Sequence, residues 1–194
     1  MTRTLYGGLS NLSGQNGYAN TFMNAQDQQA VEAAEALLAN LQASAIHAQQ
    51  YGSVKQGSIS DIQNSQNLLQ SLANCWSVTA SSSGLTVPQQ NTALSNVHIA
   101  NDSITALEAR ITIFNNEITR AKLEQFQTGA LAAATKAEID SIAASFQTAR
   151  NAGTIMSQAD VTTAQQDRTA LQGEMSSLNQ TTNSQITQCY AFAN

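Results

Sequence analysis

Charged side chains are scarce in this chain. Lys, Arg, Asp and Glu make up 11% of its 194 residues, whereas a typical soluble domain has about 25%. The formal net charge is -5, and the basic residues form no continuous stripe. A protein that binds nucleic acid needs such a stripe to neutralise phosphates, so we expect no nucleic-acid partner. Gln, Asn, Ser and Thr fill the gap and predict a polar, mostly uncharged surface.

Proline and aromatic residues are also scarce. The chain has one Pro, and aromatic residues make up 5% of it. The core must therefore be built mainly from Ala, Leu, Ile and Val. Because Pro interrupts helices and almost none is present, long uninterrupted helices are favoured. We expect an all-α fold.

Long apolar runs are absent. No stretch approaches the ~20 apolar residues that span a bilayer, so we expect no membrane span. The first residues also lack the apolar run of about 7–15 residues that a secretory signal needs. Two alternatives stay open: the chain remains inside the cell, or it is a mature form whose signal was removed.

Catalytic and metal-binding motifs are missing as well. His47 and His98 are the two histidines, and neither has a second ligand at helical spacing. No local signature makes a nucleophile of either cysteine. We therefore predict no catalytic residue, no metal site, no cofactor and no small-molecule substrate, and a protein that is not an enzyme.

The first half of the chain predicts a helical hairpin. Apolar positions between Asn24 and Tyr51 recur at steps of three and four, which is typical of a helix. Gly52 is expected to end this helix and Gly57 to complete a turn. Ser60 then opens a second helix as a capping box with Gln63, a helix that runs to Trp76, and the Ser/Gly-rich residues 77–87 form a loop.

The second half predicts further helices. Pro88 suits the first turn of a helix that runs to about Gln127. Gly129 either ends that helix or is tolerated within it at ~1 kcal/mol, because apolar periodicity resumes at Leu131, Ile142, Phe146 and Ala149. Ser157 and Asp160 start the last helix. Its inward face comprises Val161, Ala164, Arg168, Leu171, Met175, Leu178, Thr182, Gln185 and Cys189.

Together these patterns predict an elongated bundle of about four to five helices. Residues 23–194 would form a single helical domain, and residues 1–22 a flexible N-terminal arm rich in Gly and Asn. Charged residues gather on the third predicted helix at the spacing of surface ion pairs, which indicates a solvated face: Glu108, Glu117, Glu124, Arg110, Arg120 and Lys122.

The two cysteines fall at helix ends. Cys75 lies near the end of the second predicted helix, and Cys189 lies on the inward face of the last helix, where the apolar residues run out. A bond between them would fix two weakly packed ends and stabilise the fold by roughly 4–5 kcal/mol. The alternative is a pair of buried free thiols. We favour the disulfide, which implies an oxidising compartment.

Two features suggest a protein partner. Arg168 interrupts the inward face of the last helix; either its stem lies along the edge of the core or this face meets a partner. The arm carries Leu5, Tyr6, Tyr18 and Phe22 among Gly and Asn. It is either a disordered start or a peptide that becomes ordered on a neighbouring subunit, and we assign these five residues to partner binding.

Helix order and composition resemble those of the minor-pilus, pilus-tip subunits of type IV secretion systems. The resemblance rests on Asn24–Tyr51, the loop 77–87 and Ser157–Cys189, and covers roughly residues 24–190. It implies an extracytoplasmic protein of the periplasm or cell surface with a role in pilus nucleation or tip adhesion. Its partners would be other subunits of the assembly, further copies of itself included.

The sequence therefore favours a non-enzymatic structural or interaction protein. Low charge removes long-range repulsion between copies, and many Gln, Asn and Ser side chains supply short hydrogen bonds. The alternative is an internal or tail structural protein of a virus particle, because Ala/Gln-rich helices and a Gly/Asn/aromatic arm suit it equally well.

Overall fold

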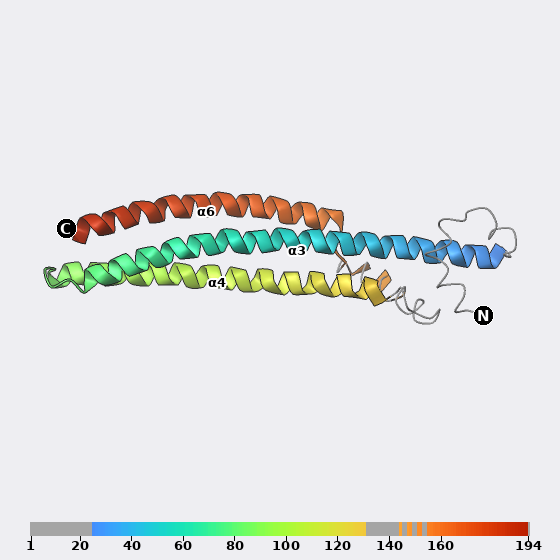
Figure 1. Ribbon diagram of the computed structural model, residues 1–194, viewed down its shortest axis with the longest axis horizontal. Helices are drawn as coiled ribbons and strands as arrows, with labels where there is room; N and C mark the ends of the chain where they lie inside the picture. The colour runs from blue at the N-terminus through green and yellow to red at the C-terminus, as the bar shows by residue number, and fades with distance from the viewer. Residues whose placement is uncertain (1–24, 131–143, 145–146, 149–150, 153–154, 194) are drawn as a thin grey trace. The chain divides into compact units, whose positions relative to one another are not determined.

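The computed structural model describes residues 25–130, 144, 147–148, 151–152 and 155–193. This part of the chain contains three long helices, α3 (Ala25–Ala80), α4 (Val87–Ala130) and α6 (Gln158–Ala193) (Figure 1). No strand occurs among these residues. The all-α class is thus confirmed, and the described residues form three long helices, which does not confirm the predicted number of four to five.

The chain divides into two compact units. One comprises Met1–Tyr51 with Arg120–Val161, and the other comprises Gly52–Thr119 with Thr162–Asn194. The single helical domain over residues 23–194 and the arm over residues 1–22 stay predictions. In the first unit, Tyr51 packs against a small buried cluster of Ala48, Ala121 and Met156. The second unit is a three-helix bundle and contains the features discussed below.

The predicted hairpin at Gly52 and Gly57 is wrong. Helix α3 is continuous over 56 residues and passes through both glycines. The Ser60 hydroxyl donates to the Gln56 carbonyl at 3.2 Å, which is a bond made inside a helix and not at its start. A glycine inside a helix costs only ~1 kcal/mol, and burial of neighbours such as Ile62, which is 0% exposed, offsets that cost.

The predicted loop 77–87 is shorter than expected, because α3 continues to Ala80. Residues 81–86 connect it to α4. Thr86 caps α4: its amide and hydroxyl donate to Oε1 of Gln89 at 2.9 and 2.7 Å. Pro88 lies in the first turn of α4, as predicted, where its missing N–H has no helical partner to lose.

Helix α6 begins as predicted. The amide and hydroxyl of Ser157 both donate to Oδ2 of Asp160 at 2.7 Å, and the Asp160 amide donates back to the Ser157 hydroxyl at 3.3 Å. This is the capping box. The inward face of α6 also agrees with its 3–4 pattern, since six of its positions are buried: Val161, Ala164, Leu171, Met175, Thr182 and Cys189.

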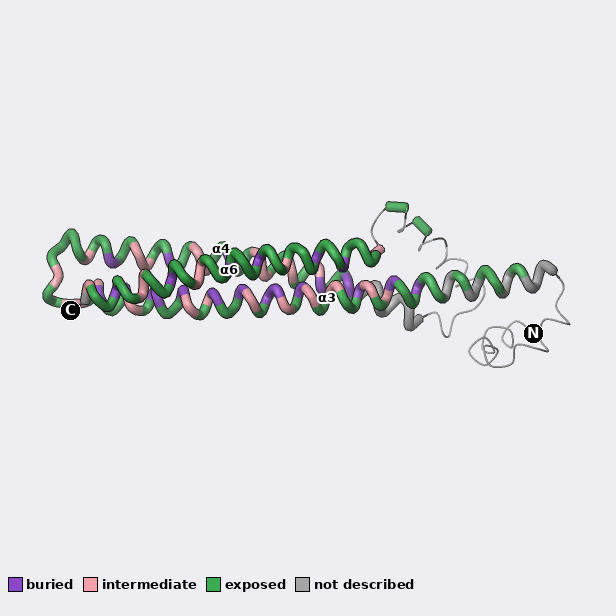
Figure 2. Tube along the Cα trace, turned by 90° about the horizontal axis from the view of Figure 1, so that it is seen from above, coloured by how far each residue is buried: buried purple, intermediate pink, exposed green. Residues whose placement is uncertain are grey.

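In the second unit, α3 and α6 run in the same direction and α4 runs in the opposite one. Asp61 meets Arg168 and Cys75 meets Cys189 further along both helices, whereas Lys55 meets Glu117 of α4. Buried residues recur along the sides on which these helices pack (Figure 2). They form two core clusters: Leu72, Ala73, Trp76, Ala93, Ala100 and Cys189; and Ile62, Leu69, Leu107, Leu171 and Met175.

Candidate functional site

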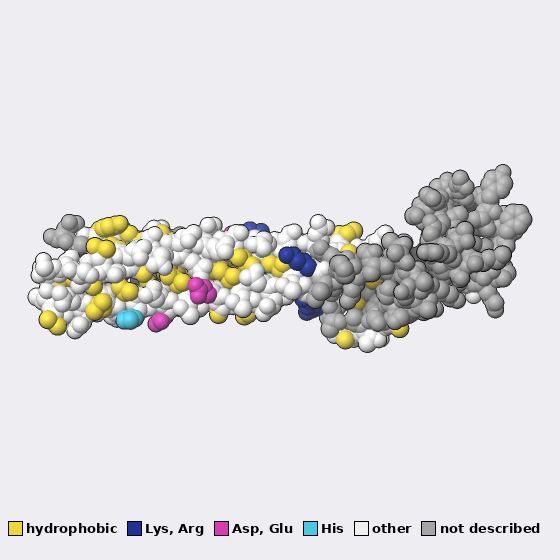
Figure 3. All heavy atoms as spheres, turned by 60° about the horizontal axis from the view of Figure 1, so that its bottom comes forward, with side chains coloured by type: hydrophobic (Ala, Val, Ile, Leu, Met, Phe, Trp, Pro, Cys, Tyr) yellow, Lys and Arg dark blue, Asp and Glu magenta, His cyan; other side chains and the backbone are white. Residues whose placement is uncertain are grey.

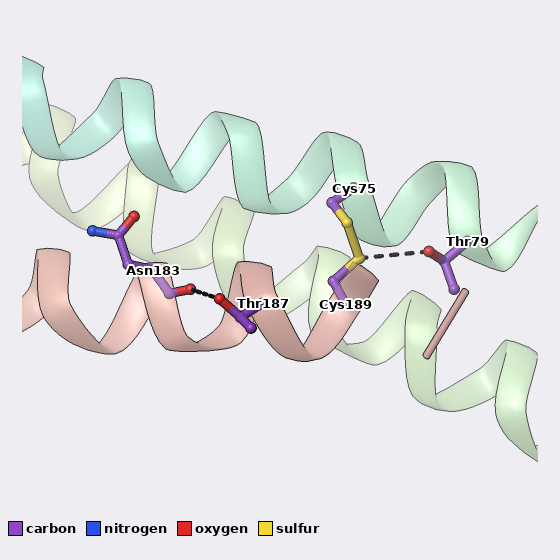
Figure 4. Close-up of a disulfide and its surroundings, with 5 residues drawn as sticks. All are labelled: Cys75, Thr79, Asn183, Thr187 and Cys189. Carbon is purple, nitrogen blue, oxygen red and sulfur yellow. Dashed lines mark hydrogen bonds between the residues drawn. A yellow bond between two sulfur atoms is a disulfide. The ribbon is translucent and has the colours of Figure 1, made fainter. Parts of the chain in front are cut away.

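A disulfide joins the last turns of α3 and α6. The sulfur atoms of Cys75 and Cys189 are 2.09 Å apart and their Cα atoms 6.3 Å apart (Figure 4). This is the pair that the sequence predicts. Cys189 is fully buried, and the Thr79 hydroxyl lies 3.5 Å from its sulfur. Beside the bond, the rings of Trp76 and Phe192 meet edge to face at 5.6 Å.

The disulfide holds α6 where its apolar face runs out. Between Leu178 and the half-buried Ile186, the inward positions are Thr182 and Gln185. Thr182 is buried, but its hydroxyl donates to the Leu178 carbonyl of its own helix at 2.8 Å and so adds no bond to α3 or α4. Cys189 restores a connection to α3 across a sequence separation of 114 residues. Without that bond, the Trp76–Phe192 contact and a few apolar neighbours would hold this end.

A buried amine lies between α3 and α4. The Lys55 side chain is 7% exposed, and its Nζ lies 3.0 Å from a Glu117 carboxylate oxygen. The same nitrogen lies 4.8 Å from the centre of the Phe114 ring, in a cation–π contact. The predicted solvated face of this helix is therefore wrong at Glu117, whose carboxylate faces a lysine 62 positions earlier in the chain. The 3–4 pattern of α3 alone could not show that pairing.

Arg168 contacts α3. Its Nε donates to Oδ2 of Asp61 at 2.9 Å, and Nε2 of Gln172 donates to the same oxygen at 3.1 Å. The Arg168 guanidinium lies directly against Gly57, where a Cβ atom would collide with it. The interruption of the inward face is thus explained within the chain. A role for Arg168 in binding a partner stays a prediction.

Three ion pairs each join a different pair of helices. Lys55–Glu117 joins α3 to α4, and Arg168–Asp61 joins α6 to α3. The third, Arg110–Glu174, joins α4 to α6 at 2.9 Å. A bond from Nε2 of Gln66 to the Ile104 carbonyl at 3.2 Å adds to the α3–α4 contact. Most of the few charged side chains in this unit thus form ion pairs between helices.

Comparison with models of protein families, with curated proteins and with solved structures found no match for this chain.

A groove between α4 and α6 has a volume of about 310 Å³. Lys55, Arg110 and Glu174 line it, together with Phe114 and Asp167. The first three already take part in the ion pairs described above. The groove is therefore bordered by groups that hold the bundle together.

Neither histidine belongs to an assembled site in the described residues. His47 is half-buried and His98 is exposed. Across the ranges that the structure describes, no three His, Cys, Asp or Glu side chains come together as metal ligands would. The absence of enzymatic activity, cofactors and small-molecule substrates stays a prediction.

The other predicted partner-binding residues, Leu5, Tyr6, Tyr18 and Phe22, lie outside the described residues, as does the apolar periodicity from Leu131 to Ala149 apart from a few positions. None of the described helices carries an apolar stretch sufficient to cross a membrane.

Proposed function

We propose that this protein is a non-enzymatic structural subunit that assembles with other proteins in an oxidising compartment outside the cytoplasm. The observation that carries the proposal is the disulfide between Cys75 and Cys189. Disulfides persist in oxidising compartments and are rare in the cytosol, where thiols are kept reduced. The bond lies in a core cluster that includes neither histidine, so a structural use accounts for it better than a catalytic one.

The use of charge supports a structural role. Ion pairs join all three pairs of helices in the second unit, so these charges hold the bundle together and leave a surface dominated by uncharged polar groups. Such a surface exerts little long-range repulsion on other copies or subunits. Short hydrogen bonds from Gln, Asn, Ser and Thr can then decide how subunits fit.

Within this class, we propose a pilus-tip or minor-pilus subunit of a secretion system as the specific form. Two of the features behind that resemblance are present, a long helix in the first half, α3, and a long Gln-rich helix at the end, α6. The resemblance also implies a less regular middle, and α4 departs from this as a continuous helix of 44 residues, in agreement with the helix predicted from Pro88 to about Gln127. Partners would then be other subunits of the same assembly.

The test is the thiol state and location of the protein in cells of its native source. Free thiols are trapped by alkylation at lysis, and the protein is followed through fractionation beside one cytosolic marker and one exported, disulfide-bonded marker. We expect no alkylated cysteine, an extracytoplasmic fraction and co-purification with other subunits. A variant with both cysteines replaced by Ala calibrates the gel shift.

Two alkylated cysteines per chain in a monomeric cytosolic protein would contradict the proposal. Recovery in purified virus particles would instead support the virion alternative and reject the pilus assignment.

A further inference from the structure

Helix α4 has a row of exposed side chains away from its buried face that includes two isoleucines, of which Ile113 also borders the groove between α4 and α6. In the second unit, the exposed large apolar side chains of α3 and α6 are Val78 and Tyr190, both close to the helix ends. By contrast, Ile99 and Ile113 lie well inside α4 and are 57% and 56% exposed, whereas Val87 and Leu94, at 68% and 48%, lie nearer its start. Figure 3, in which the α4 side of Figure 1 comes forward, shows small separate groups of hydrophobic side chains among polar ones, with acidic side chains and a histidine nearby.

The spacing of this outer face is that of a coiled coil. Its positions follow one another at alternating steps of four and three, as in a helix that packs along another helix. All of them are exposed. We name them the outer face of α4: Ser95, Ile99, Asp102, Ala106, Ala109, Ile113 and Asn116. Single exposed apolar residues are ordinary, but a 4–3 repeat over three heptads with small residues at its centre is a surface onto which a second helix fits.

We infer that the outer face of α4 binds the same face of a second copy of this chain, with the two α4 helices antiparallel. The inference rests on the proposed function, because it names a second copy as one of the assembled subunits. An isologous pair uses one patch twice. Ala106 and Ala109 would lie at its centre, where small side chains let two helices approach closely.

Charge complementarity favours a second copy of the chain as the partner and an antiparallel arrangement of the two α4 helices. Asp102 is exposed and makes no ion pair within the described ranges. Arg110 is 40% exposed and uses Nη1 to bind Glu174, although a guanidinium carries five N–H donors. When two antiparallel copies are centred on Ala106–Ala109, Asp102 of one falls within a helical turn of Arg110 of the other.

A parallel pair would place Asp102 beside Asp102 and Arg110 beside Arg110. Like charges at these positions disfavour that direction. The face spans 22 positions from Ser95 to Asn116, or roughly 33 Å at about 1.5 Å per residue. A single helix pair of that length falls at the small end of stable interfaces, below about 1,200 Å², so the expected dimer is weak and concentration-dependent.

The experiment is sedimentation of the purified, oxidised full chain from micromolar to millimolar concentration. Wild type should pass from monomer to dimer over this range. D102R and R110E should each weaken dimerisation at least tenfold, because each homodimer then opposes like charges twice. Their equimolar mixture should recover dimers. In the mixed pair, the positive charge introduced at position 102 of one chain faces the negative charge introduced at position 110 of the other, while the second contact keeps its wild-type residues.

The matched control is V78S, which removes an exposed apolar side chain outside this face and should leave dimerisation unchanged. The double variant I99S/I113S should abolish dimerisation while keeping normal helicity by circular dichroism. If R110E does not fold, this double variant tests the dimer in its place. A monomer at every concentration overturns the inference, as does equal weakening by V78S or a mixture that fails to recover. The thiol state of the protein in cells does not depend on dimerisation. The proposed function is therefore tested separately from this inference.

Discussion

Replacing Gly57 by Ala tests whether a tertiary contact explains a glycine in the middle of α3. In an unconstrained helix, Ala is favoured over Gly by about 0.8–1 kcal/mol. Gly173 in α6 provides the matched case, because it is exposed and nothing lies within 4 Å of a Cβ built there. We therefore expect G173A to raise the free energy of unfolding by about 0.5–1 kcal/mol.

At Gly57 the same change has an opposing cost. The new methyl group would collide with the Arg168 guanidinium and push it away from Asp61. The Arg168 and Asp61 side chains are 35% and 22% exposed, so the pair is partly screened and its loss should cost about 1–2 kcal/mol. The two effects oppose each other, and G57A should be neutral to about 1 kcal/mol destabilising, which is the difference of these two terms.

The assay is urea unfolding followed by circular dichroism on wild type, G57A, G173A, R168A and the double variant G57A/R168A. Once Arg168 is removed, the methyl group meets no guanidinium, and G57A should stabilise the R168A background by about 0.5–1 kcal/mol. The coupling free energy between positions 57 and 168 should thus be about 1–2 kcal/mol. G173A should give the same increment in both backgrounds.

One result would refute this reasoning. If G57A stabilises wild type as much as G173A does, with coupling to position 168 below about 0.3–0.5 kcal/mol, Arg168 does not require a glycine beneath it.

Three further predictions concern the disulfide, the buried amine and the arm. Replacing Cys75 and Cys189 by Ala should lower the free energy of unfolding by about 4–5 kcal/mol, since the bond closes a loop of 114 residues; a free energy of unfolding from urea titration within about 0.5 kcal/mol of wild type would contradict this. K55M should destabilise by about 1–3 kcal/mol because it leaves the Glu117 carboxylate without its Lys55 partner, and adding E117Q should recover part of the loss; additive losses would show that the pair is not coupled. Deleting residues 1–22 should change stability by no more than about 0.5 kcal/mol yet prevent incorporation into the native assembly, and normal incorporation would remove the proposed role of the arm.

The sequence by itself determined the parts of the fold that depend on residues near one another in the chain. The capping box of Ser157 and Asp160 involves a single helical turn, and so does the position of Pro88. Neighbouring residues in the sequence are therefore enough to predict both. The inward face of α6 could also be read, because a 3–4 repeat of small and apolar residues has one buried side whatever it packs against. The even count of cysteines at helix ends likewise sufficed to predict the bond between Cys75 and Cys189.

Tertiary packing alone decided what Gly52 and Gly57 do. Glycine is a weak helix former, and local rules therefore predicted a turn, yet the cost of about 1 kcal/mol per glycine is smaller than the gain from burying neighbours such as Ile59 and Ile62, which are 3% and 0% exposed. Arg168, 111 positions further along the chain, fills the space that Gly57 leaves.

The sequence also could not predict which charged residues on different helices form ion pairs. The 3–4 rule identifies which residues share a face of one helix, but not which residue of another helix lies opposite. Lys55 and Glu117 meet only because α3 and α4 pack antiparallel with one particular register. A helical repeat looks the same in every register, and it is the close packing of side chains between helices that fixes one of them.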